Sequence, residues 1–276
     1  MPTSTSRLRL LGALVIVALL TGCAATQSHD KHAESVQQAA RSGGGFAAAL
    51  AQHEASATSD DQKKALLYNL ERGELLALNR RYADSIEALA LADVKVKEWE
   101  EAAKTSPDKL LGTLGAATIS ERLKPYEGQD YEKVFLTTRL ALNRLVLGDL
   151  DNARVEIKRT HEREAVIAEF RAKETAKAEA EAKEKGADAK GKELNGYPVE
   201  TLNDPAVLKL KNGYQNALSH YLSGFVYEVL GEDGLAAPGY RKAIELRPEV
   251  PLLEEGLRGL DQRTSFTHKR LQAKTD

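Results

Sequence analysis

The chain has 276 residues, of which 29% are charged and only 5% are aromatic, and its formal net charge is −2. This length allows one or two domains with a buried core. The scarcity of aromatic residues favours a helical protein over a β-sandwich. The balanced charge excludes the concentrated positive surface that nucleic-acid binding needs. A single cysteine excludes an intrachain disulfide framework.

The first 22 residues have the layout of a bacterial export signal. Arg7 and Arg9 precede an apolar run over residues 10–20 that is too short to span a membrane comfortably. The segment ends at residues 20–23, LTGC, which resembles the lipobox of bacterial lipoproteins. That resemblance implies that residues 1–22 are removed and that Cys23 is lipidated. An ordinary signal peptide with an incidental cysteine is the alternative interpretation.

Acyl chains on Cys23 would anchor the protein to a membrane, since more than one chain would be buried in the bilayer. Ala24 follows the cysteine, where enteric-type lipoproteins of the inner membrane often have Asp. The resemblance therefore implies attachment to the outer membrane of the bacterial cell envelope, with the protein facing the periplasm.

Residues 23–61 are expected to form the lipidated cysteine and a flexible tether, because they are rich in Ala, Ser, Gln and Gly. Within this stretch, residues 46–53 favour a short helix. His29 and His32 are spaced like a pair of metal ligands. A flexible tail offers no preorganised third ligand, so we predict unligated surface histidines and no metal.

Three later stretches, near residues 66–99, 134–167 and 217–250, share the pattern of a helix–turn–helix repeat. Small residues stand where two helices must touch, and this pattern resembles a tetratricopeptide unit. We therefore predict an all-α fold over residues 62–276, a tetratricopeptide-like α-solenoid of about three irregular helix pairs. The residues expected to pack these repeats are Gly73, Tyr82, Ala92, Gly148, Ala153, Gly224, Tyr227, Gly231, Ala236, Tyr240, Ala243 and Pro248.

Three phrases of the sequence carry a further resemblance: LLYNLERGELLAL, EKVFLTTRLALNRLVLGDLDNARVE and YQNALSHYLSGFVYEVLGE. Together they resemble an uncharacterised family of bacterial lipoproteins that contain tetratricopeptide repeats. The resemblance covers most of the mature chain outside the tether and a charged insertion. It implies helical repeats and a lipid anchor, and it provides no catalytic residues to carry over.

The charged insertion spans residues 168–195, where Lys, Glu and Ala alternate with favourable pairs four residues apart. We predict a solvated helical extension that frays near Gly186. Residues 186–192, GADAKGK, lack the final Ser or Thr of a phosphate loop, because Glu193 stands there. A phosphate loop also follows a buried strand, and none is predicted here, so we expect no nucleotide.

The C-terminal stretch from residue 252 to about 271 places Leu253, Leu257 and Leu260 on one helical face. A helix with this apolar face would cover the exposed side of the third repeat as a cap.

No catalytic motif is apparent. His161 and Glu162 begin like the zinc-protease motif HExxH, but Ala165 stands where the second histidine belongs. No serine lies in a GxSxG sequence, and the only cysteine is the expected lipidation site. We therefore expect no enzyme and no cofactor.

The first helix of each pair carries the candidate groove for a partner. The candidate residues are Asn69, Arg72, Arg139, Asn143 and Tyr221. These observations predict a lipoprotein of the cell envelope that acts as a protein–protein interaction scaffold or as an assembly or regulatory factor. Two alternatives stay open. One is an envelope hydrolase or glycan-acting enzyme whose residues lie far apart in sequence, and the other is a passive spacer.

Overall fold

The structure is a computed structural model that describes residues 29–115, 126–184, 193–194, 197–198 and 212–261. These residues are almost wholly helical, so the expected all-α class is confirmed. Their only strands are β1 (Glu193–Leu194) and β2 (Tyr197–Pro198), which pair antiparallel over two residues. No helix within these ranges is both long and apolar enough to span a bilayer. The lipobox at residues 20–23 lies outside them.

The chain divides into two compact units, residues 1–60 and 61–276. The described part of the first unit is a helical hairpin of α2 (His29–Arg41) and α3 (Gly45–Ser56). The single turn α4 (Asp60–Lys63) begins at the last residue of this unit and continues into the second. The short helix predicted over residues 46–53 is confirmed as part of α3. The prediction of a flexible tether is wrong from His29 onward. Its many Ala and Gln residues are good helix formers, and two such helices stabilise each other by packing.

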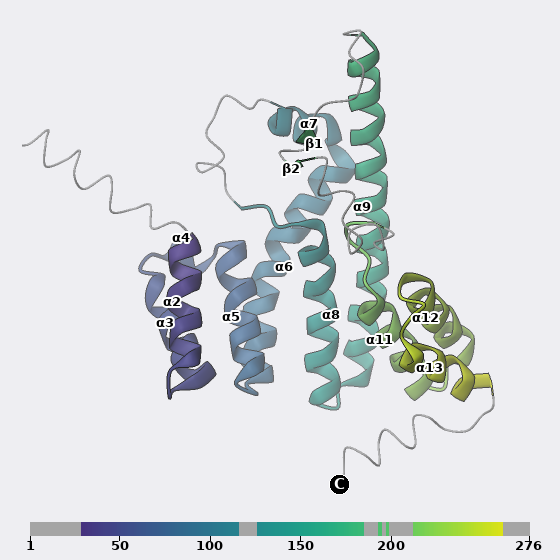
Figure 1. Ribbon diagram of the computed structural model, residues 1–276, viewed down its shortest axis with the longest axis horizontal. Helices are drawn as coiled ribbons and strands as arrows, with labels where there is room; N and C mark the ends of the chain where they lie inside the picture. Colours follow the sequence, from purple (N-terminus) through teal and green to yellow (C-terminus); the bar gives the residue numbers. More distant parts are fainter. Residues whose placement is uncertain (1–28, 116–125, 185–192, 195–196, 199–211, 262–276) are drawn as a thin grey trace, which may run out of the picture. The chain divides into compact units, whose positions relative to one another are not determined.

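The described residues of the second unit form three helical hairpins and two further helices, besides most of the turn α4 (Figure 1). In chain order its helices are α5 (Leu66–Leu78), α6 (Tyr82–Thr105), α7 (Pro107–Gly115), α8 (Asp130–Val146), α9 (Leu150–Glu184), α11 (Ala217–Val229), α12 (Asp233–Leu246) and α13 (Pro251–Asp261). The hairpins α5–α6, α8–α9 and α11–α12 fall on the three expected repeats. Successive hairpins are in contact, because the second helix of one packs on the first helix of the next: α6 meets α8 and α9 meets α11.

The turns of the hairpins follow local sequence rules. Gly148 and Gly231 have positive φ angles of 77° and 74°, a conformation that costs glycine little. Arg80 takes the same role in the first hairpin with φ 60°, although it carries a side chain. Asp149 caps α9, because its Oδ1 accepts from the backbone N–H of Asn152 at 3.3 Å.

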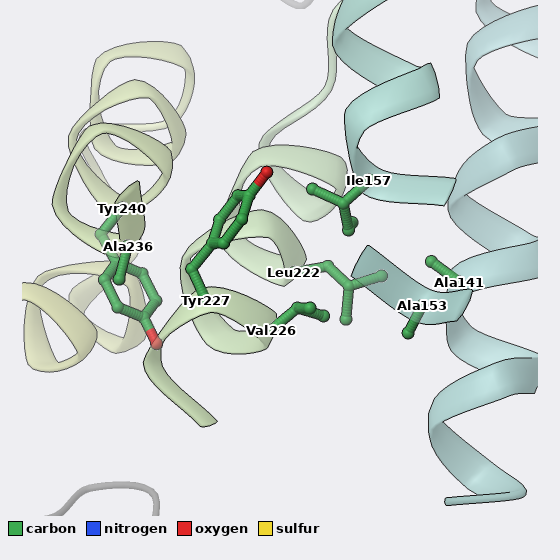
Figure 2. Close-up of a cluster of buried hydrophobic side chains, with 8 residues drawn as sticks. All are labelled: Ala141, Ala153, Ile157, Leu222, Val226, Tyr227, Ala236 and Tyr240. Atoms are coloured by element: carbon green, nitrogen blue, oxygen red, sulfur yellow. The ribbon is translucent and has the colours of Figure 1, made fainter. Parts of the chain in front are cut away.

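One cluster of buried side chains joins the second and third hairpins (Figure 2). Leu222, Val226 and Tyr227 of α11 lie between α12 on one side and α8 and α9 on the other. Two further clusters join α5, α6 and α8, and α6, α7, α8 and α9. The second of these includes Trp99, whose ring meets Phe170 edge-on at 5.4 Å.

Close helix contact depends on the small residues of the repeat pattern. A Cβ atom on Gly224 would lie 2.6 Å from the ring of Tyr240, so only glycine fits beneath that ring. A Cβ atom on Gly73 would likewise lie 2.5 Å from the side chain of Leu89. The sequence pattern thus identified two glycines at close contacts between paired helices, but it missed Gly239 of α12, where a Cβ atom would lie 2.5 Å from the backbone nitrogen of Gly224.

The charged insertion and the terminal helix also agree with the predictions. α9 continues without a break through the charged residues to Glu184, and residues 185–192 lie outside the described ranges. α13 buries Leu253, and its Leu257 and Leu260 pack on the cluster of Figure 2. The expected continuation of this helix beyond Asp261 lies outside the described residues.

Candidate interaction surface

The residues predicted to pack the repeats do so with few exceptions. The buried members are Gly73, Ala92, Ala153, Gly224, Tyr227, Ala236, Tyr240 and Ala243. Tyr82 is only half-buried at the start of α6, and Gly148 and Gly231 serve the turns. Pro248 is exposed just beyond the end of α12, where it stops the helix and does not pack.

Two residues of the predicted groove, Asn69 and Asn143, are buried, so their assignment to a binding groove is wrong. Asn69 Nδ2 donates to the carbonyls of Lys63 and Ala65, at 2.7 and 3.0 Å. Asn143 Nδ2 donates to Ser85 Oγ at 2.8 Å, and that hydroxyl donates to the carbonyl of Gly73. The amides therefore satisfy buried oxygens within and between hairpins.

Arg139 occupies a partly exposed position on α8, as the prediction requires. Its Nε and Nη2 atoms lie 2.8 and 2.6 Å from the two carboxylate oxygens of Glu74 on α5. The guanidinium also lies over Phe135, one turn earlier on α8, with 5.7 Å from Cζ to the ring centroid. Phe135 is half-buried, and the Arg139 side chain is 25% exposed. This arrangement holds the cation in place while leaving it accessible.

Tyr221 and Phe225 lie four residues apart on α11, and both are half-buried. The ring of Tyr221 lies 5.4 Å from the ring of Tyr240. α11 is fastened to α8 by a hydrogen bond of 2.6 Å between the hydroxyls of Thr138 and Ser219.

The remaining groove candidate, Arg72, is half-buried on α5. Arg72 lies two residues from Glu74 on α5 and therefore on the opposite side of that helix. We call a set of half-buried residues on the first helices the first-helix face; its members are Glu74, Phe135, Arg139, Tyr221 and Phe225. Glu74, Phe135 and Phe225 were missed in the sequence. The i,i+4 spacing of Phe135 with Arg139, and of Tyr221 with Phe225, is the signal that would have found two of them.

A buried ionic network joins α6 and α9 and was also missed. Arg163 Nη2 lies 2.9 Å from Asp93 Oδ1, and Arg159 and Glu100 complete the network. Burial alone would raise the pKa of Asp93, but hydrogen bonds and charges from Arg163 and Arg159 outweigh it and hold that pKa below its usual value. Asp93 interrupts the apolar stripe of α6 beside Ala92 and Val96, which was a visible signal. The network serves packing, since its members are largely buried.

A second polar cluster lies between α9 and α11. The rings of His161 and His220 stack at 5.4 Å with an interplanar angle of 12°. Glu164 Oε2 lies 3.2 Å from His220 Nε2 and accepts a hydrogen bond from Gln215 Nε2 at 3.0 Å. Burial, and then the charge of His220, lowers the pKa of His161, while Glu164 partly opposes them. The residue at the missing zinc-ligand position, Ala165, is exposed.

No protein-family model, curated protein or solved structure matches this chain. Its function is therefore inferred from its own residues. The strongest surface candidate is the first-helix face, because it combines a fixed cation with half-exposed aromatic rings.

Proposed function

We propose that this protein is a lipoprotein of the bacterial cell envelope, anchored through Cys23, that binds a protein partner through the first-helix face. In this proposal the three hairpins act as a tetratricopeptide-like solenoid that displays its first helices. The lipobox, the spacing of the hairpins and the glycines beneath Leu89 and Tyr240 support it.

The observation that carries the proposal is the position of Arg139. Its ion pair with Glu74 spans two hairpins, and its contact with Phe135 holds the guanidinium over an aromatic ring. Arginine and aromatic residues held in one geometry are enriched among the residues that dominate binding energy. Side chains that are already ordered lose little entropy when a partner binds. The face is therefore suited to recognise a protein segment with acidic and apolar groups.

Partner capture tests the face. A photo-crosslinking residue replaces Phe225 in the full chain, and crosslinked partners are recovered from membranes. We expect Arg139→Glu to lower recovery by about tenfold or more, the scale of a dominant binding residue. The matched control is Arg258→Glu on α13, which also breaks a surface ion pair, with Glu254, away from the face. Unchanged recovery with Arg139→Glu, or an equal loss with Arg258→Glu, would contradict the proposal.

A charge exchange separates binding from packing. The double variant Arg139→Glu, Glu74→Arg restores an ion pair between α5 and α8 but moves the positive charge to the other helix. If Arg139 binds the partner directly, recovery stays low in the double variant. Full recovery would show that the ion pair only holds the hairpins together.

The anchor is tested by Cys23→Ala. We expect incorporation of labelled palmitate to be lost and the protein to leave the membrane fraction, because without the thiol of Cys23 no acyl chain can be attached to anchor it. Retained labelling would mean that Cys23 is not the lipidation site. Hydrolysis of peptidoglycan or peptide substrates that one carboxylate substitution abolishes would instead favour the enzyme alternative.

A further inference from the structure

The α2–α3 hairpin brings together histidines that are distant in sequence. His32 Nε2 on α2 lies 3.0 Å from His53 Nδ1 on α3, 21 residues later. Their ring centroids are 5.2 Å apart with an interplanar angle of 46°. His29 lies three residues before His32 on the same helix, with its ring centroid 6.5 Å from that of His32. The rigid third histidine that the isolated pair lacked is thus supplied by α3.

The spacing of the two ring nitrogens suits a shared metal ion. A tetrahedral Zn²⁺ ion with Zn–N distances of about 2.0–2.1 Å holds two ligand nitrogens about 3.3 Å apart. The observed 3.0 Å between His32 Nε2 and His53 Nδ1 differs from this by a few tenths of an ångström. A small rotation of either ring opens the pair to that distance. The same placement of the two rings therefore allows either a hydrogen bond between them or a shared metal ion.

Ligation also defines which nitrogen of each ring carries the proton. Imidazole binds metals in its neutral form. With the ion bound, His32 carries its proton on Nδ1 and His53 carries its proton on Nε2. Neutral rings thus exchange one tautomer for another and release no net proton.

We propose that His32, His53 and His29 bind a divalent transition-metal ion, with Zn²⁺ as the best fit. His32 and His53 are the fixed ligands from two helices, and His29 reaches the ion from the first turn of α2. Three histidines leave a fourth position of a tetrahedral ion open to water or to a further ligand. The ion joins α2 to α3 and stabilises the hairpin against separation of the helices. The site is independent of the first-helix face and of the proposed function.

Metal titration of the full chain tests the site. Zn²⁺ is added in competition with a chromophoric chelator, and Co²⁺ is used as a spectroscopic substitute. We expect one ion per chain and the intense visible bands of four-coordinate Co²⁺. The variants His32→Ala and His53→Ala should each weaken binding by at least about tenfold, the scale of losing a metal contact. His29→Ala should have a smaller effect, and His268→Ala is the control that removes a histidine elsewhere in the chain.

Two measurements keep the result unambiguous. Circular dichroism in the presence of a chelator shows whether each variant retains its helix content, and His53→Gln keeps the side-chain size if His53→Ala does not fold. X-ray absorption of the Zn²⁺ complex counts its imidazole ligands. Two or three imidazoles support the site. Absence of saturable binding, a single imidazole, or equal affinity in the double variant His32→Ala, His53→Ala would overturn it.

Discussion

The contact between α11 and α12 makes a sharp prediction at Gly239. A Cβ atom there would lie 2.5 Å from the backbone nitrogen of Gly224 and 2.9 Å from the carbonyl oxygen of His220. Both neighbours are backbone atoms of α11, so no side chain can rotate away and the helices must separate. That separation would also loosen the packing of the Tyr240 ring on Gly224.

The magnitude follows from two opposing effects. Overpacking of a close contact costs about 1–3 kcal/mol. Replacing glycine by alanine inside a helix contributes about 1 kcal/mol in the opposite direction. We therefore expect Gly239→Ala to lower the free energy of unfolding by up to about 2 kcal/mol. This corresponds to a decrease in Tm of up to roughly 8 °C for a unit of this size.

Gly234→Ala is the matched control, because it makes the same change in the same helix. Apart from its chain neighbours and the adjoining backbone of its own helix, no atom lies within 4 Å of the Cβ position at Gly234. Its helix propensity therefore acts alone, and we expect no loss of stability and a gain of up to about 1 kcal/mol. Urea unfolding of both variants, followed by far-ultraviolet circular dichroism, gives the comparison. If Gly239→Ala were as stable as Gly234→Ala, the close contact between the two helices would be refuted.

Four other residues give testable effects on stability. Arg80→Gly should stabilise the protein by about 0.5–1 kcal/mol in urea unfolding, because a left-handed φ strains any residue with a Cβ. The control Arg80→Ala keeps that strain, and an equal gain in stability for Arg80→Ala would contradict the reasoning. Arg163→Met should destabilise the protein by about 3–5 kcal/mol, because the substitution leaves Asp93 buried without its main partner. A loss below about 1 kcal/mol in the same assay would show that solvent compensates the charge of Asp93. The pKa of Asp93 is lower in the folded state, so its contribution to stability is complete above the unfolded pKa of about 3.9 and is lost as pH falls through the folded value. Asp93→Asn should flatten this part of the acid-unfolding curve, and an unchanged curve would count against the assignment. The pKa of His161 is also lowered, so folding favours its neutral form and stability falls as pH drops below about 6.5 towards the folded pKa. Thermal unfolding across this range should show a smaller pH dependence in His161→Gln, and an equal dependence would assign the effect to another group.

Local patterns predicted the hairpins because the contacts within each pair are short in sequence. Gly224 and Tyr240 are 16 residues apart, and the turn glycine Gly231 lies between them. Helical periodicity and a glycine at the turn are enough to bring such residues together. The same reasoning holds for the charged extension of α9, whose stability depends on pairs one turn apart.

The groove prediction failed for Asn69 and Asn143 because burial is a property of the neighbouring hairpin. A polar residue on a mixed helical face is usually exposed, so the sequence predicts exposure for Asn143. Its hydrogen-bond acceptor, the Ser85 hydroxyl, lies on another helix and is known only once the helices are packed. The ionic network of Asp93 and Arg163 has the same origin, since its partners are 70 residues apart.

The sequence by itself determined the helical class, the hairpin positions and several of the small residues at close contacts, because these depend on local spacing. The lipidation of Cys23 stays a prediction. The tertiary structure decided which polar residues are buried, where Arg139 finds Glu74, and that His32 meets His53. Each of those pairs brings together residues from different helices. Their distance depends on how whole helices pack, and no local pattern encodes it.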